Sequence, residues 1–258
     1  MSEPLPPSPS FLIVGAQKGA TRWFRLNLGR HPEIFTAEEE LAFFNTERYR
    51  RGIEFYRRSF EGWNGERVVG EATPGYMIWR HEPELVAERI HRDLPGVKLF
   101  AVLRDPVDRL YSAFIHHMKR GRIGPEEDLL ARVRGVPPEE DQLQLVAGGW
   151  YARSLEPYMK RFGPRLTVIL NEDARADPRA VYASALGELG VDDSFVPDEL
   201  EQVVFSRTPP PDSRYSRPGG GRRALSEDER LALAPYFTED IDRLEQMLER
   251  DLSSWKQP

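Results

Sequence analysis

Short apolar runs alternate along the chain with longer stretches in which apolar positions recur every three or four residues. The apolar runs predict buried β-strands at residues 11–14, 67–69, 98–103 and 166–170. The longer stretches predict helices at residues 22–28, 83–93, 150–162 and 178–189, with a further helix from residue 106. Because strands and helices alternate from residue 11 to residue 190, we expect an α/β fold in which a central parallel sheet is flanked by helices on both faces.

Composition narrows the class of protein. The 258 residues are 40% apolar and 30% charged, which is typical of a globular chain, and we expect one domain at residues 11–258 after a disordered Pro/Ser-rich leader at residues 1–10. No apolar run reaches the roughly 18 residues that a membrane span needs. The absence of cysteine excludes disulfides and cysteine-ligated zinc, and it favours a cytoplasmic location. A net charge of −6 argues against nucleic acid as a partner.

The first predicted strand leads into a loop of small residues, GAQKGAT at residues 15–21, which contains one lysine. A strand, a small-residue loop and a helix N-terminus together form an anion cradle, because backbone N–H groups and the helix dipole face the ligand. Lys18 adds a full positive charge. In the nucleotide triphosphatase loop the order is G-x-x-x-x-G-K-[ST]. Here Lys18 precedes Gly19 and the loop is one residue shorter, so we predict a phosphate loop of a different class.

A glutamate, Glu71, follows the second predicted strand. Ligands of open α/β sheets bind at the carboxyl ends of the strands, which places Glu71 beside a candidate site. A carboxylate there acts as a general base if its surroundings raise its pKa. The alternative is a glutamate that only caps the following turn, and the residue pattern does not decide between the two.

Polar residues line one face of the helix that follows the third predicted strand. Asp105–Pro106 predicts an N-cap and a first helical residue. Asp108, Ser112 and His116 share a face because they are spaced by four residues. Arg104 and Ser112 are placed to converge on one phosphate, since an arginine fork and a hydroxyl both donate hydrogen bonds to phosphate oxygens.

Three further stretches give weaker signals. Residues 49–60 predict a helix with aromatic residues toward the core and a solvated basic face. Residues 121–142 predict a surface excursion to which we assign no chemistry. The irregular segment at residues 205–223 ends in Arg222 and Arg223, which either close over an anionic ligand or belong to a flexible solvated loop.

Several stretches resemble the sulfotransferases that use 3′-phosphoadenosine 5′-phosphosulfate (PAPS) as donor. They are GAQKGATR at residues 15–22, VVGEATPGY at 68–76, LRDPVDRLYSAFIHH at 103–117 and the late GGGRR loop. Within this family the chain is most similar to heparan-sulfate-type N- and O-sulfotransferase domains and their bacterial relatives. EELAFFN at residues 39–45 and GIEFYRRSF at 52–60 resemble the N-sulfotransferase branch. The resemblance runs from about residue 11 to about 252 and implies the sulfotransferase fold, which is similar to that of the P-loop nucleoside triphosphatases and has a phosphate-binding loop after the first strand.

The resemblance also implies roles for single residues. It implies that the phosphate loop holds the 5′ end of PAPS, that Arg104 and Ser112 hold the 3′-phosphate, and that the late loop closes over the donor. The implied donor-binding residues are Gln17, Lys18, Gly19, Ala20, Thr21, Arg22, Arg104, Ser112, Arg222 and Arg223. The implied catalytic residues are Glu71 as general base, Lys18 as the group that stabilises the leaving oxygen, and His116 at the acceptor side. The product is 3′-phosphoadenosine 5′-phosphate (PAP), and no metal is expected.

Two departures from the family pattern bear on the acceptor. Ala72 follows the glutamate where many glycan O-sulfotransferases have lysine, and Glu39 replaces a second lysine. A long polyanion needs a basic groove, for which the sequence offers only Lys119, Arg120 and Arg122. We therefore expect a small or neutral acceptor, such as a carbohydrate or natural product, that receives the sulfuryl group on a hydroxyl or an amine.

Two alternatives use the same residues. A phosphate-loop kinase for a small molecule needs the Gly-Lys-[Ser/Thr] order, which is absent, and a strand-end acid for Mg²⁺, for which only Asp105 is available. A non-catalytic nucleotide-binding relative has no need for an acid at position 71. The oligomeric state is left open by the sequence.

Overall fold

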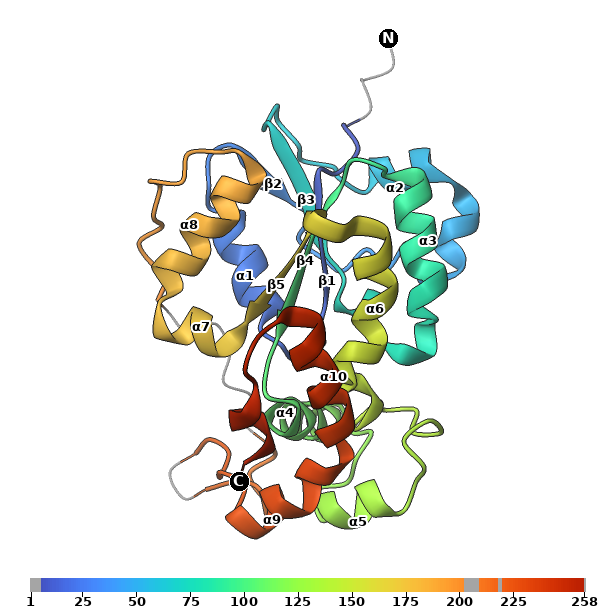
Figure 1. Cartoon of the computed structure of the whole chain (residues 1–258), viewed down its shortest axis with the longest axis vertical. Coiled ribbons are helices and arrows are strands. Elements are labelled where there is room, and N and C mark those ends of the chain that lie inside the picture. Colours follow the sequence, from blue (N-terminus) through green and yellow to red (C-terminus); the bar gives the residue numbers. More distant parts are fainter. Residues whose placement is uncertain (1–5, 202–208, 218–219, 258) are drawn as a thin grey trace. The chain divides into compact units, whose positions relative to one another are not determined.

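A parallel β-sheet forms the centre of one of the two compact units of the chain (Figure 1). The computed structural model describes residues 6–201, 209–217 and 220–257. Among these residues, five strands pair in the order β2-β3-β1-β4-β5. Their bounds are Phe11–Gly15 for β1, Ile34–Thr36 for β2, Val68–Ala72 for β3, Lys98–Leu103 for β4 and Leu166–Leu170 for β5. All four neighbouring pairs are parallel, as the alternation of strands and helices predicts.

The chain divides into two compact units. Residues 1–103 and 155–204 form the first, and residues 104–154 and 205–258 form the second. The sheet of the first unit carries helices on both faces, with α1 and α8 on one face and α3 and α6 on the other (Figure 1). Helix bounds here are Thr21–Leu28 (α1), Ile53–Arg58 (α2), Pro83–Asp93 (α3), Tyr151–Phe162 (α6, which begins in the second unit), Asn171–Ala176 (α7) and Pro178–Leu189 (α8).

The second unit is helical. Its helices are Pro106–Lys119 (α4), Leu129–Arg134 (α5), Glu227–Leu233 (α9) and Thr238–Leu248 (α10). The buried face of α4 includes Leu110, Phe114 and Met118, whose spacing of four residues places them on one side of the helix. In the part of the chain that the structure describes, no helix is both long and apolar enough to cross a membrane.

Aromatic packing fixes the first unit around β1. Phe11, Phe24 and Phe100 are fully or almost fully buried, and their rings meet edge to face at centroid distances of 5.2 to 6.1 Å. A Cβ atom at Gly70 of β3 would lie 2.3 Å from the Phe11 ring, so only glycine fits there. This packing fixes the two strands from which the candidate site is built, β1 and β3.

Most predicted elements are confirmed, two predictions are corrected and one strand was missed. The expected strand at residues 67–69 is β3, which extends to Ala72, so Glu71 lies inside the strand rather than after it. The expected helix at residues 49–60 is a 3₁₀ turn, Glu47–Arg51, followed by α2, because Gly52 takes a φ of 79° between them. The short strand β2 was not predicted. The first part of the expected disordered leader, residues 1–5, lies outside the described residues, whereas Ser10 donates its backbone N–H to the Val69 carbonyl at 2.7 Å.

Candidate functional site

The loop between β1 and α1 is held tightly against the neighbouring strand β4. The Ala16 N–H donates to the Val102 carbonyl at 2.8 Å, and the Gly19 N–H donates to the Ala16 carbonyl at 2.9 Å. A Cβ atom at Gly19 would lie 2.0 Å from the Val102 oxygen, so this position requires glycine. Lys18 and Ala20 adopt positive φ angles of 71° and 86°. The loop therefore has one defined path, which the small residues of the motif make possible.

The first turn of α1 is suited to an anion. It contains no acidic residue, and its N-cap residue, Ala20, makes no side-chain capping hydrogen bond. Such N–H groups carry the positive end of the helix dipole. Of the six predicted loop residues, Gly19 and Thr21 are buried, Gln17, Lys18 and Ala20 are half-buried, and Arg22 is exposed.

Glu71 lies on β3, beside β1, where it pairs in register with Leu12. Its side chain is fully buried. Oε1 accepts hydrogen bonds from the hydroxyls of Tyr76 at 2.7 Å and Tyr56 at 3.2 Å, and Oε2 accepts one from Thr73 at 2.7 Å. All three donors are side-chain hydroxyls, so the observed contacts do not support the interpretation of Glu71 as a backbone cap of the following turn.

Burial controls the protonation of Glu71. Removal from water disfavours the carboxylate and raises the pKa of Glu71 to about 7, although the hydroxyls of Thr73, Tyr76 and Tyr56 each favour the ionised form. The negative charge of Glu40 adds a smaller upward effect. A carboxyl group with a pKa near 7 accepts and releases protons at physiological pH, which is the property that a general base requires.

In the second unit, the polar residues predicted to share one face of α4 lie on the side of the helix that is only partly buried. Arg104, Asp108, Ser112 and His116 are all half-buried, whereas the residues around them on α4 are mostly buried. Asp105 caps the helix as predicted, because its side chain accepts a hydrogen bond from the Asp108 N–H at 2.8 Å. The structure therefore brings Arg104, Ser112 and His116 onto one surface stripe.

Cations surround Asp108 on this stripe. Its carboxylate pairs with Arg104 on one oxygen and with Arg230 of α9 on the other. Burial works to raise the pKa of Asp108, but the charges of Arg104, Arg230 and Arg222 outweigh burial and hold the pKa below its usual range. Asp108 thus remains ionised and orients the guanidinium groups. Arg230 was not predicted, because its position next to α4 depends on how α9 packs.

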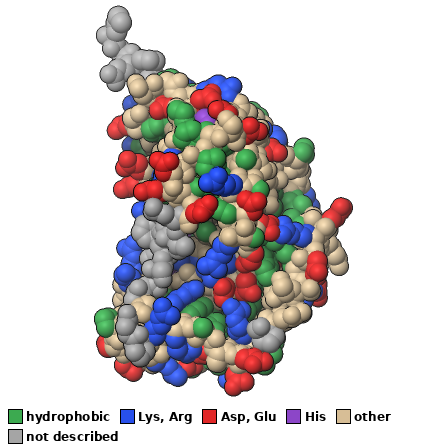
Figure 2. Space-filling view, turned by 90° about the vertical axis from the view of Figure 1, so that its left-hand side faces the viewer, with side chains coloured by type: hydrophobic (Ala, Val, Ile, Leu, Met, Phe, Trp, Pro, Cys, Tyr) green, Lys and Arg blue, Asp and Glu red, His purple; other side chains and the backbone are tan. Residues whose placement is uncertain are grey.

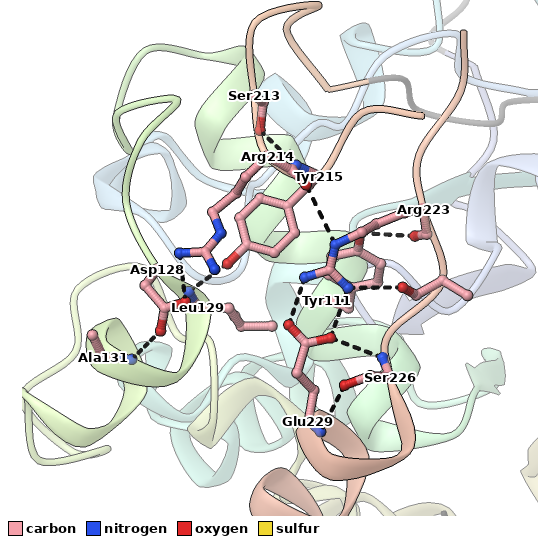
Figure 3. Close-up of polar contacts among 11 residues, drawn as sticks. Tyr111, Asp128, Leu129, Ala131, Ser213, Arg214, Tyr215, Arg223, Ser226 and Glu229 are labelled. Carbon is pink, nitrogen blue, oxygen red and sulfur yellow. Dashed lines mark hydrogen bonds and ion pairs between the residues drawn. The ribbon is translucent and has the colours of Figure 1, made fainter. Parts of the chain in front are cut away.

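Of the two late-loop arginines that were expected to bind a ligand, Arg223 holds the loop in place (Figure 3). The Arg223 guanidinium forms two hydrogen bonds to the Glu229 carboxylate, at 2.7 and 2.6 Å, and the Arg223 carbonyl accepts a bond from the Tyr111 hydroxyl at 2.8 Å. Arg222 lies over the Tyr111 ring at 5.0 Å. Arg223 therefore anchors the loop, and its contact with a ligand stays a prediction. The first glycine of the predicted GGGRR loop, Gly219, lies outside the described residues.

The predicted residues fall into two groups, one in each unit. The first unit contains Gln17, Lys18, Gly19, Ala20, Thr21, Arg22 and Glu71, and the second contains Arg104, Ser112, His116, Arg222 and Arg223. Sequence reasoning missed the hydroxyl groups around Glu71. Thr73 and Tyr76 stand in the same VVGEATPGY stretch as Glu71 and were visible as polar groups near it. Tyr56 was assigned to the core from its helical spacing alone.

Comparison with known proteins decides the family. The profile described as "Sulfotransferase domain" matches residues 8–204, about three quarters of the chain. This chain belongs to the sulfotransferase domain family. The match includes the phosphate loop, Glu71 and the α4 stripe, and it confirms the resemblance stated from the sequence.

Individual relatives agree with the family assignment. The chain is 32% identical over 154 residues to human heparan sulfate glucosamine 3-O-sulfotransferase 6, covering 60% of this chain and 44% of that protein. It is 30% identical over 200 residues to human bifunctional heparan sulfate N-deacetylase/N-sulfotransferase 3, covering 71% and 22%. The chain thus spans less than half the length of these curated relatives. A solved sulfotransferase from Alicyclobacillus acidocaldarius matches over 97% of this chain and 100% of its own, with a TM-score of 0.76 and 29% identity.

Proposed function

We propose that this sulfotransferase transfers the sulfuryl group of PAPS to a hydroxyl or amine of a carbohydrate, natural product or other small acceptor. The observation that carries the proposal is the fully buried Glu71 on β3, beside the strand that leads into the lysine-containing phosphate loop, in a chain of the sulfotransferase family. Such an arrangement supplies a base for the acceptor and a cradle for an anionic donor.

The proposed transfer is a single in-line displacement. Glu71 takes the proton from the acceptor as the acceptor oxygen or nitrogen bonds to sulfur, and the bond from sulfur to the 5′-phosphate oxygen breaks. Negative charge then develops on the leaving phosphate oxygen, where Lys18 and the N–H groups of α1 are proposed to stabilise it. His116 is proposed to assist at the acceptor side.

Donor recognition is proposed to follow the residue roles that the family resemblance implies. The loop from Gln17 to Arg22 would bind the 5′ end of the donor, and Arg104 and Ser112 the 3′-phosphate, supported by the pairing of Arg104 with an ionised Asp108. An arginine held by a carboxylate is pre-oriented, so it loses little freedom when a phosphate binds.

The acceptor is proposed to be a small or neutral carbohydrate or natural product. The two human relatives are named for heparan sulfate, which favours a glycan among these classes. One is named for 3-O-sulfation and the other for N-sulfation, so both a hydroxyl and an amine remain open. A cytoplasmic location stays a prediction from the lack of cysteine.

The donor is tested by titrating the protein with PAP, ADP and ATP·Mg²⁺ by calorimetry. We expect PAP to bind without Mg²⁺ and at least tenfold more tightly than ADP. Lys18→Ala, Arg104→Ala and Ser112→Ala should each weaken PAP, because a hydrogen bond to a charged group contributes about 1.5–3 kcal/mol. Lys160→Ala is the matched control, since Lys160 is an exposed lysine paired with Glu156 on α6. Binding of ATP·Mg²⁺ in place of PAP would contradict the proposal and favour the kinase alternative.

A further inference from the structure

The Glu71 carboxylate is held by hydroxyl groups that are themselves fixed by the backbone. The Phe43 N–H donates to the Tyr76 hydroxyl at 3.2 Å, and that hydroxyl donates to Glu71 Oε1 at 2.7 Å. On the other side, the Ala42 N–H donates to the Thr73 hydroxyl at 3.1 Å, which donates to Glu71 Oε2 at 2.7 Å. Two adjacent amides of one segment thus orient two hydroxyls toward the two oxygens of one carboxylate.

Packing locks both tyrosines in place. Tyr56 and Tyr76 are fully buried. The Tyr56 ring stacks on Phe43 with centroids 4.6 Å apart, and Phe44 meets the Tyr76 ring edge to face at 5.7 Å. The Tyr76 carbonyl also accepts a hydrogen bond from the Tyr158 hydroxyl at 2.7 Å. Neither phenol can turn away from Glu71 without disrupting this aromatic cluster.

The hydrogen bonds divide unequally between the two carboxylate oxygens. Each oxygen has two lone pairs in the carboxylate plane. Among the described residues, Oε1 accepts two hydrogen bonds and Oε2 accepts one. Oε1 is therefore fully used by the protein, and a lone pair remains on Oε2.

We propose that these three hydroxyls are positioning groups that hold the Glu71 carboxylate in one orientation and leave Oε2 as the atom that takes the acceptor's proton. The proposal rests on Glu71 being the general base proposed above. In the step, the acceptor heteroatom bonds to sulfur, its proton passes to Oε2, and the sulfur–oxygen bond to the donor phosphate breaks with its electron pair leaving on that phosphate oxygen.

The charged and titratable groups around Glu71 determine how its pKa should change when one of them is removed. Tyr56 lies on α2, Thr73 and Tyr76 follow β3, and Glu40 acts on Glu71 through its negative charge from the segment after β2. Because each hydroxyl favours the ionised carboxyl, removing one should raise the pKa of Glu71. Glu40 repels the same charge, so its removal should act in the opposite direction.

The first arm of the test needs neither donor nor acceptor. The full chain, labelled with carbon-13 at the glutamate carboxyl, is titrated by NMR, and the Glu71 signal is assigned by its loss in Glu71→Gln. Tyr56→Phe should move the Glu71 titration upward by about one pH unit, and Tyr76→Phe by more, because its bond is shorter. Tyr49→Phe is the matched control, since Tyr49 packs against Phe43 but its hydroxyl donates to Asp93.

The second arm measures the pH profile of sulfuryl transfer from PAPS to a glucosamine tetrasaccharide, which offers both hydroxyls and amines. Tyr56→Phe should lower kcat about fivefold at pH 7 and recover fully by pH 9, where Glu71 is ionised again. Thr73→Val should stay slow at high pH, because Oε2 loses the one hydrogen-bond partner that it has among the described residues. Thr73→Ser should restore the rate.

The outcomes separate this proposal from the proposed function. If the pKa of Glu71 rises in Tyr56→Phe and Tyr76→Phe but not in Tyr49→Phe, the positioning proposal is supported, whether or not the tetrasaccharide is sulfated. An unchanged Glu71 titration in both folded tyrosine variants overturns the positioning proposal, even if transfer still requires Glu71. If Tyr76→Phe fails to fold because the Phe43 amide loses its partner, Tyr56→Phe decides the question, since no backbone group depends on the Tyr56 hydroxyl among the described contacts.

Discussion

At the scale of single residues, the role proposed for Glu71 competes with the stability of the folded chain. A carboxyl group whose pKa is raised to about 7 by burial is protonated at low pH in the folded chain and must be charged while buried at higher pH. The unfolded chain ionises it near its ordinary value of 4.5. The folded pKa is the higher one, so the stabilising effect is complete below pH 4.5 and is lost as the pH rises through 7.

Glu71→Gln should therefore gain stability relative to the parent protein as the pH rises. We expect the difference in unfolding free energy between the two proteins to change by about 3 kcal/mol in favour of the variant from pH 4.5 to pH 8, while transfer activity is lost. Urea unfolding at several pH values measures this, with Glu88→Gln on α3 as an exposed control. A constant difference across that range would show that Glu71 ionises normally.

At position 19 glycine is required for a steric reason. The sequence shows only a glycine in a small-residue loop, and the reason for it appears in the fold: the Val102 carbonyl of β4 occupies the space that a Cβ atom needs. The motif therefore depends on a strand that lies about eighty residues further along the chain. Local pattern identified the loop correctly, but the contact that constrains it is a tertiary one.

At the scale of elements, α9 and the late loop stabilise each other through Glu229. This residue completes the capping box of α9 with Ser226 and also binds both nitrogens of the Arg223 guanidinium. The Arg223 hydrogen bonds outweigh burial and lower the pKa of Glu229 to about 2. Because the folded pKa is below the unfolded one, the stabilisation is present above about pH 4.5 and is lost as the pH falls toward 2.

Glu229→Gln should separate the two roles of this residue. Glutamine can keep the capping hydrogen bond but removes the charge that pairs with Arg223. We expect a loss of about 1 kcal/mol at pH 7 that shrinks as the pH falls from 4.5 toward 2. Ser226→Ala should instead cost a similar amount at every pH, because it removes a cap without changing charge. Thermal unfolding at stepped pH tests both, and a pH-independent loss in Glu229→Gln would contradict the assignment.

At the scale of the whole molecule, the sheet was the most predictable part. The runs at residues 98–103 and 166–170 gave β4 and β5 with their observed ends, because a buried parallel strand is a continuous apolar run. Edge strand β2 has only three residues and pairs with β3 alone, so its apolar run is too short to stand out. The hydrogen-bond partners of Glu71 were the least predictable part. Tyr56 of α2 contacts Glu71 only because of how α2 packs in the folded chain, which the local sequence pattern does not show.

The overall charge of the molecule leads to a prediction about the acceptor. The chain carries a net charge of −6, and on the face drawn in Figure 2 acidic side chains are interspersed with the basic ones that gather in its lower half. The basic residues Lys119, Arg120 and Arg122 are exposed where α4 ends. The helix dipole favours positive charge at this end of a helix, so these residues need no anionic acceptor to explain them.

A neutral oligosaccharide should therefore be sulfated with a KM that depends little on salt. Raising NaCl from 50 to 250 mM should change this KM less than twofold, because few acceptor charges are screened. Replacing Lys119, Arg120 and Arg122 together by alanine should leave the KM unchanged as well. A polyuronate chain of equal length serves as the comparison. If the polyuronate is preferred at 50 mM, weakens steeply with salt and is lost in the triple variant, these three residues form an acceptor groove and the acceptor is a polyanion, because only a multiply charged ligand gains its affinity from such contacts.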